Sequence, residues 1–120
     1  MANDSYPDHH NLSAYQKAKS ITKQIIVTLP TQLPRNQGSL SILNQIIRSV
    51  SSIGANIAEG YGRNSKKEYK QFLKIAKGSS LETEYWLEII QESYNLDLSD
   101  IINSNKEILK LLTVTIKRLS

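Results

Sequence analysis

The chain of 120 residues has no cysteine, one tryptophan and only two histidines. Without cysteine there can be no disulfide and no thiolate metal site, which agrees with a reducing compartment. The histidines, His9 and His10, lie outside every segment with helical periodicity, so the Glu-x-x-His pairs of a di-iron bundle are missing. No cofactor loop or phosphate cradle is present in the sequence. We therefore expect a protein that is not an enzyme and that uses no metal and no cofactor.

Long apolar runs and a basic, apolar leader are missing as well. No stretch approaches the ~18 apolar residues that a membrane span requires, and the polar N-terminus does not have the pattern of a signal peptide. We expect a cytoplasmic protein in which residues 1–11 form a flexible tail and residues 12–120 form one folded domain.

Apolar residues recur at steps of three and four through most of the chain, and no segment alternates with period two. This pattern predicts helices over about 12–28, 39–59 and 65–94, and a last helix that begins at Ser99 or Ser104. Short connections after the second and third helices favour antiparallel neighbours. The predicted fold is therefore all-α, an antiparallel up-down-up-down four-helix bundle.

Proline, glycine and serine mark the predicted helix ends. Pro30 is expected to end the first helix, because proline disfavours a helical conformation in the residue before it. Gly60 and Gly62 are expected to end the second helix, because glycine readily adopts the left-handed conformation. Two Ser-x-x-Glu sequences, at Ser65 and Ser104, have the pattern of capping boxes.

Three strings in the middle of the chain resemble a known family. They are SIGANIAEGYGR at 52–63, SKKEY at 65–69 and AKGSSLE at 76–82. They resemble the four-helix-bundle proteins encoded in intervening sequences of bacterial large-subunit ribosomal RNA, to which the accessory variability determinants of diversity-generating retroelements look related. The resemblance extends over about residues 12–119 and is most specific at 56–60 and 78–79.

What the resemblance implies is an antiparallel bundle that assembles into a homopentameric ring. It also implies nucleic-acid binding and, for the retroelement relatives, partnership with a reverse transcriptase. The chain departs from the family pattern at Gly54-Ala55, where many members carry Pro-Ser, and at Tyr15, where many carry tryptophan. These departures leave the subfamily, and hence the partner, open.

A cluster of cations opens the third predicted helix, in a chain whose net charge of +4 permits nucleic-acid contact without requiring it. Four of its lysines share one helix face over roughly 16 Å, which is long enough to meet several phosphates. Cations in the first turn oppose the helix dipole, so local helix stability does not explain them. We interpret the cluster as a surface that binds RNA or DNA, with a merely solvated lysine face as the alternative. Its members are Arg63, Lys66, Lys67, Lys70, Lys74 and Lys77.

Two further features bear on this interpretation. Tyr61 and Tyr69 lie close to the lysines in sequence and are candidates for stacking on bases. Farther along, Glu84 and Glu88 continue the lysine face and Tyr85 lies beside the core stripe. A face that is basic in one half and acidic in the other suits contact between copies. Glu84, Tyr85 and Glu88 are thus predicted oligomer contacts, and an assembly or adaptor role is the main alternative to nucleic-acid binding.

Four polar residues interrupt apolar faces or border them: Asn56, Glu59, Ser79 and Glu82. The first two are one helical turn apart, and so are the last two. Polar groups that become buried must find hydrogen-bond partners. We interpret these four residues as a structural polar network, or as part of a subunit interface, rather than as a catalytic site.

Overall fold

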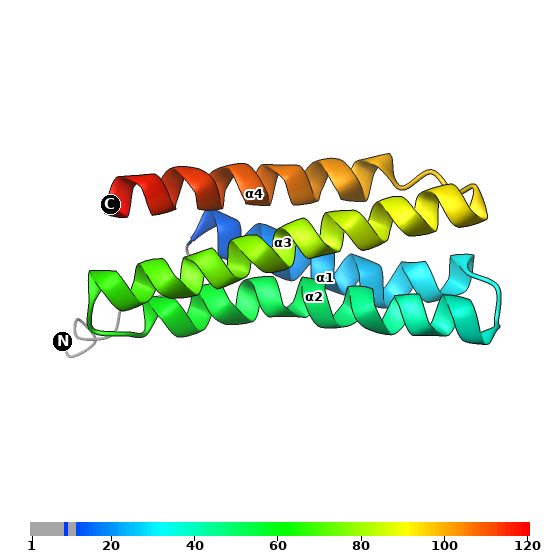
Figure 1. Cartoon of the computed structure of the whole chain (residues 1–120), viewed down its shortest axis with the longest axis horizontal. Coiled ribbons are helices and arrows are strands. Elements are labelled where there is room, and N and C mark those ends of the chain that lie inside the picture. The colour runs from blue at the N-terminus through cyan, green and yellow to red at the C-terminus, as the bar shows by residue number, and fades with distance from the viewer. Residues whose placement is uncertain (1–8, 10–11) are drawn as a thin grey trace.

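The computed structural model describes residue 9 and residues 12–120, so the predicted tail, residues 1–11, lies almost entirely outside the described residues. Residues 12–120 form four α-helices that run along the long axis of the molecule (Figure 1). Consecutive helices run in opposite directions, and the described part measures 50 × 27 × 21 Å. The predicted antiparallel four-helix bundle is confirmed. The helices are α1 (Ser13–Gln32), α2 (Gln37–Tyr61), α3 (Lys66–Tyr94) and α4 (Ser99–Leu119).

Each helix packs against two neighbours, in the order α1, α2, α3, α4 and back to α1. The core consists of branched aliphatic side chains from all four helices, and burying each of them contributes about 1.5–3 kcal/mol. The largest side chains that are almost fully buried include Ile21, Ile25, Ile46, Ile53, Ile57, Leu73, Leu87, Ile90, Ile108 and Leu112. In the described part of the chain, no helix has both the length and the apolar character that a membrane span requires.

The first helix does not end at Pro30, as predicted, but continues to Gln32. Pro30 is exposed and lies in the last turn of the helix. Proline has no backbone N–H, so one carbonyl of the preceding turn lacks its helical partner, and water can bind that carbonyl instead. The chain leaves the helix at Leu33, which is extended at φ −102° and ψ 146° and precedes Pro34. The rule that proline disfavours a helical residue before it therefore applies at Pro34.

The second helix passes Gly60 and ends at Tyr61, with the other predicted stop, Gly62, as its C-cap. Gly60 is helical, Gly62 caps the helix at φ −79°, and none of the glycines has a positive φ. The prediction that these glycines adopt the left-handed conformation is therefore wrong. Gly60 has a steric role instead, because a Cβ atom there would lie 2.5 Å from the Cβ of Phe72 on α3. The left-handed conformation is found at Asn95, which caps α3 at φ 53°.

The predicted capping boxes are partly wrong. Ser65 does cap α3, and its hydroxyl accepts the Glu68 backbone N–H at 3.0 Å. The Glu68 carboxylate contacts that hydroxyl at 3.3 Å instead of reaching back to the Ser65 backbone. Ser104 lies inside α4, because that helix begins at Ser99, the earlier of the two predicted starts. A capping box with bonds in both directions begins α2, where Asn36 and Ser39 each accept the other's backbone N–H.

Candidate nucleic-acid interface

Charge is distributed unevenly along the bundle. Three hydrogen bonds between neighbouring helices, Thr22 to Val50, Thr83 to Ser49 and Ser80 to Asn105, show which residues of the four helices lie at the same height and so mark a middle plane. The basic end, residues 12–23, 50–81 and 107–120, holds twelve of the fifteen lysines and arginines but only three carboxylate side chains. The acidic end, residues 24–49 and 82–106, holds three cations and six carboxylates. A polyanion would therefore be attracted to one end of the molecule.

The predicted lysines of α3 lie at the basic end and carry uncompensated charge. Lys66, Lys67 and Lys74 are exposed, whereas Lys70 and Lys77 are partly buried. None of the five forms an ion pair with a carboxylate of the described residues. The Nζ atom of Lys70 donates to the Ser120 hydroxyl at 2.9 Å, which places this cation at the C-terminal end of α4. Lys70 therefore also compensates the partial negative charge of that helix end.

Arg63 differs from the lysines, because its guanidinium is held on the protein. It forms an ion pair with Glu59 at 2.7 Å and lies 3.9 Å from a carboxylate oxygen of Glu68. Its Cζ atom also lies 4.8 Å from the centroid of the Phe72 ring. A phosphate that binds Arg63 would have to compete with two carboxylates, so this member of the predicted cluster is the least available.

Helix α4 adds cations that the sequence interpretation missed. Because α4 runs antiparallel to α3, its C-terminal half lies beside the lysine-rich half of α3, as the contact between Lys70 and Ser120 shows. The antiparallel order was predicted, so the signal for this proximity was available. We define the α3–α4 basic surface as Lys66, Lys67, Lys70, Lys74 and Lys77 of α3 and Lys110, Lys117 and Arg118 of α4.

The three predicted oligomer contacts, Glu84, Tyr85 and Glu88, do not all point outward. Glu84 turns toward α4, where its carboxylate lies 3.9 Å from the Nζ atom of Lys106 and its side chain is 20% exposed. Glu88 is exposed, and Tyr85 is 55% exposed and stacks edge-on against Trp86 with ring centroids 5.0 Å apart. The acidic half of the face is therefore interrupted, and Tyr85 and Glu88 remain as its outward part.

The match to known proteins agrees with this fold. Residues 10–115 match the profile of the family described as 23S rRNA-intervening sequence protein. The chain belongs to this family. A crystal structure of a protein of unknown function, from the S23 ribosomal protein family of Bacteroides thetaiotaomicron, is similar with a TM-score of 0.78 and 34% identity. That similarity covers 87% of this chain and 98% of the other. No curated protein sequence matches the chain.

In this family member, the predicted polar network is only partly assembled. The amide of Asn56 donates to the Ser52 backbone and hydroxyl oxygens at 2.8 Å, and the Ser52 hydroxyl lies 2.9 Å from that of Ser79. These bonds join α2 to α3. Glu59 belongs instead to the ion pair with Arg63. Glu82 accepts from two other side chains, Arg48 at 2.6 Å and the Trp86 indole at 3.0 Å, so the four residues fall into three groups.

Deeper polar contacts were missed in the sequence. Asn105 on α4 is 0% exposed, and its amide donates to the Ser80 carbonyl while its oxygen accepts the Ser80 hydroxyl, both at 2.9 Å. The Thr83 hydroxyl donates to Ser49 on α2 at 2.9 Å. Within the described residues, every buried side-chain nitrogen and oxygen has a partner. These bonds hold α3 in register with α2 and α4, and so position the basic surface.

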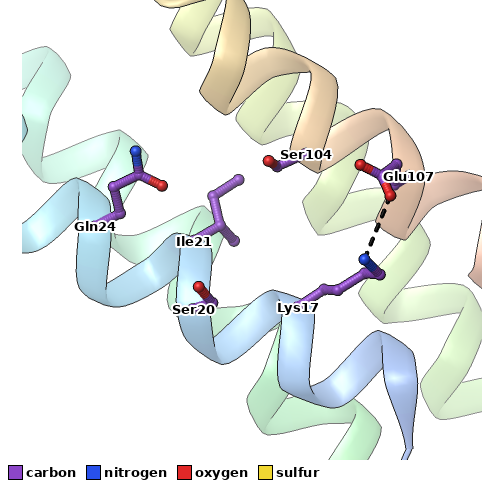
Figure 2. Close-up of a pocket in the computed structure, with 6 residues that line it drawn as sticks. All are labelled: Lys17, Ser20, Ile21, Gln24, Ser104 and Glu107. Atoms are coloured by element: carbon purple, nitrogen blue, oxygen red, sulfur yellow. Dashed lines mark hydrogen bonds and ion pairs between the residues drawn. The ribbon is translucent and has the colours of Figure 1, made fainter.

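A small hollow lies between α1 and α4 (Figure 2). It has a volume of about 150 Å³, and Ser20, Gln24 and Ser104 line it. At one side the Nζ atom of Lys17 and the carboxylate of Glu107 form an ion pair at 3.3 Å. Lys17 is therefore partly compensated and does not extend the α3–α4 basic surface. In the described part of the chain, no three His, Asp or Glu side chains are arranged to hold a metal ion.

Proposed function

We propose that this protein binds RNA or DNA through the α3–α4 basic surface, by contacts to phosphates. The observation that carries the proposal is the gathering of eight cations from two adjacent helices at one end of the bundle. None of the eight forms an ion pair with another described residue. Packing and local helix stability do not require this arrangement, because like charges on neighbouring turns repel each other.

The chemistry of the surface indicates what it would recognise. Seven of its eight cations are lysines, which act as point charges and lack the planar fork with which arginine reads guanine. Binding through such groups is independent of base sequence and is driven by the release of counterions. If about five phosphates are neutralised, the logarithm of the binding constant falls with a slope of about −4.5 against the logarithm of the salt concentration.

The proposed activity is binding alone. Contacts between ammonium groups and phosphates break no bond and transfer no proton, so we propose no catalytic residue, metal or cofactor. Assembly of several copies, such as the homopentameric ring that the family resemblance implies, would align several basic surfaces. A modest affinity per copy would then be multiplied by avidity.

Neutralising two exposed lysines of α3 tests the proposal. Each lost phosphate contact reduces the affinity about fivefold near 0.15 M salt. Lys67→Gln together with Lys74→Gln should therefore weaken binding to a fluorescent RNA or DNA by about 25-fold and make the salt slope shallower by about 1.8. Fluorescence anisotropy over a range of salt concentrations measures both quantities.

The matched control changes the same charge at the acidic end. Arg35→Gln with Arg48→Gln removes two cations that lie on the other side of the middle plane, and its affinity should fall less than threefold. Equal losses in the two variants would show that binding follows net charge and does not use the α3–α4 basic surface. Lack of binding by the unaltered protein at low salt would refute the proposed function.

A second function, assembly with other copies, is favoured by two apolar surfaces. Between α1 and α2 lies a groove of about 250 Å³ with Gly54, Ala55 and Ala58 on one wall and Lys23 at its rim. On α3, exposed Leu81 and Tyr85 form a ridge that Glu88 follows one turn later. We propose that the ridge of one copy packs into the groove of the next, with Glu88 near Lys23. The two surfaces lie on different helices, so the contact is head-to-tail and can close into a ring.

A charge swap tests this contact. Glu88→Lys and Lys23→Glu should each lower the assembled fraction measured by light scattering, because like charges would face each other across the interface. The two substitutions together should restore assembly. If the double variant stays as dissociated as the single ones, the two residues are not partners.

A further inference from the structure

The α3–α4 basic surface is rich in cations but offers no exposed aromatic ring. Helix α4 contains no phenylalanine, tyrosine or tryptophan. On the basic half of α3 the aromatic residues are Tyr69 and Phe72, and both are partly buried. The exposed aromatic residue of α3, Tyr85, lies at the acidic end. A nucleic acid on this surface would meet seven ammonium groups and the guanidinium of Arg118, but no exposed aromatic ring.

The two rings on α3 are already engaged within the protein. Phe72 lies under the guanidinium of Arg63 at 4.8 Å. Tyr69 packs edge-on against Tyr61, with ring centroids 5.4 Å apart and planes at 77°. Burial, and to a smaller extent the nearby Tyr61, raises the pKa of Tyr69, which fits a ring that is partly withdrawn from water. Tyr61 and Tyr69, which were expected to stack on bases, are therefore partly buried and packed against each other.

The absence of stacking partners affects single strands most. Proteins that bind single strands without sequence preference combine a basic groove with aromatic rings on which the bases stack. On this surface a single strand would gain phosphate contacts only, and its bases would remain in water. A duplex keeps its bases stacked on each other and needs no ring from the protein.

Charge density points the same way. A duplex carries one charge per about 1.7 Å of axis, and neutralising Z of its phosphates gives a slope of about −0.9Z, against about −0.7Z for a single strand. The cations also lie on two packed helices, whose axes are typically 8–10 Å apart. Two such rows can contact phosphates of both strands across one groove, which a single strand cannot offer.

From these observations we infer that the α3–α4 basic surface selects duplex nucleic acid over single strands. The inference rests on the proposed phosphate binding and adds the class of nucleic acid. With about five contacts, a duplex of 24 base pairs should bind roughly five- to tenfold more tightly than either of its separate strands at 0.15 M salt, with the steeper salt slope.

A gain-of-function variant tests the reason for the preference. Val114 is 41% exposed on α4 and lies one helical turn from Lys110, Lys117 and Arg118. Val114→Trp would place a ring among the cations. It should raise the affinity for the single strand about tenfold, the usual effect of stacking one base, and leave the duplex affinity within about twofold. Val27→Trp, at a 69% exposed position in the acidic end, is the matched control and should change neither affinity.

The outcomes separate the two proposals. If the protein binds neither the duplex nor the single strands, the proposed function fails. If it binds single strands as tightly as the duplex or more tightly, phosphate binding stands and the duplex inference is overturned. The inference is also overturned if Val114→Trp leaves single-strand binding unchanged, if it strengthens duplex binding equally, or if Val27→Trp has the same effect.

Discussion

Replacing Lys67, Lys74, Lys110 and Lys117 together with glutamate is expected to lower the affinity for duplex nucleic acid by about three orders of magnitude near 0.15 M salt. Four lost contacts account for most of this, at about fivefold each, and the repulsion that the new carboxylates exert on phosphates adds to it. All four side chains are exposed, and none forms an ion pair within the described residues. The fold should tolerate the change, with a cost of about 1 kcal/mol or less where Lys117 lies in the last turn of α4.

Two partial variants test whether the surface continues from α3 onto α4. Lys67→Glu with Lys74→Glu alters α3 alone, and Lys110→Glu with Lys117→Glu alters α4 alone. If both helices contact the same duplex, each pair should account for about half of the total loss on a logarithmic scale. Anisotropy titrations at equal salt measure the losses, and thermal melting followed by circular dichroism shows whether each variant is folded.

The variant with both α4 substitutions is the stricter test of whether the binding surface includes α4. If the α4 pair binds as tightly as the unaltered protein, the surface ends at α3 and the second row of cations has no part in binding. Arg35→Glu with Arg48→Glu changes the same number of charges at the acidic end and serves as the control. A loss in this control as large as that of the α4 pair would assign the binding to net charge and contradict the α3–α4 basic surface.

Some residues of the candidate site could be predicted from the sequence and others could not, for physical reasons. The lysines of α3 were visible because they are close in sequence and share one helix face. Lys110 and Lys117 were missed because they are far from the α3 lysines in sequence, although the predicted antiparallel order places the two helix halves side by side. Side-chain direction was hidden as well, since Glu84 was placed on an outward face and instead points to Lys106 across the α3–α4 contact.

The fold was easier to predict than the surface, because the spacing of apolar residues alone specifies which side of each helix is buried. The helix ends were harder, since a proline or glycine has more than one physical effect. Pro30 is accommodated in the exposed last turn of α1, and the chain leaves the helix before Pro34. From the sequence alone, Gly60 could either end a helix through its conformational freedom or be required because only a residue without a side chain fits against another helix. Only its distance to Phe72 shows that small size is what this position requires.

This distance leads to the second large effect, Gly60→Ala. In an exposed helix interior the exchange of glycine for alanine stabilises by about 1 kcal/mol. At residue 60 the new Cβ would lie 2.5 Å from the Cβ of Phe72 and 3.3 Å from Cδ1 of Tyr69, so α2 and α3 must move apart. Overpacking of this kind costs about 1–3 kcal/mol, and valine should cost more than alanine. Because the 2.5 Å overlap is between two Cβ atoms, the cost lies near the upper end of this range, and after subtraction of the helix-propensity gain we expect Gly60→Ala to lower the free energy of unfolding by about 2 kcal/mol.

Gly78→Ala is the matched control, because Gly78 is also helical but has nothing within 4 Å of the position that a Cβ would take. There the same exchange should raise the free energy of unfolding by about 0.5–1 kcal/mol, so the two variants should differ in sign. Urea unfolding followed by circular dichroism measures both values. If Gly60→Ala were as stabilising as Gly78→Ala, close packing of α2 on α3 would not be the reason for this glycine.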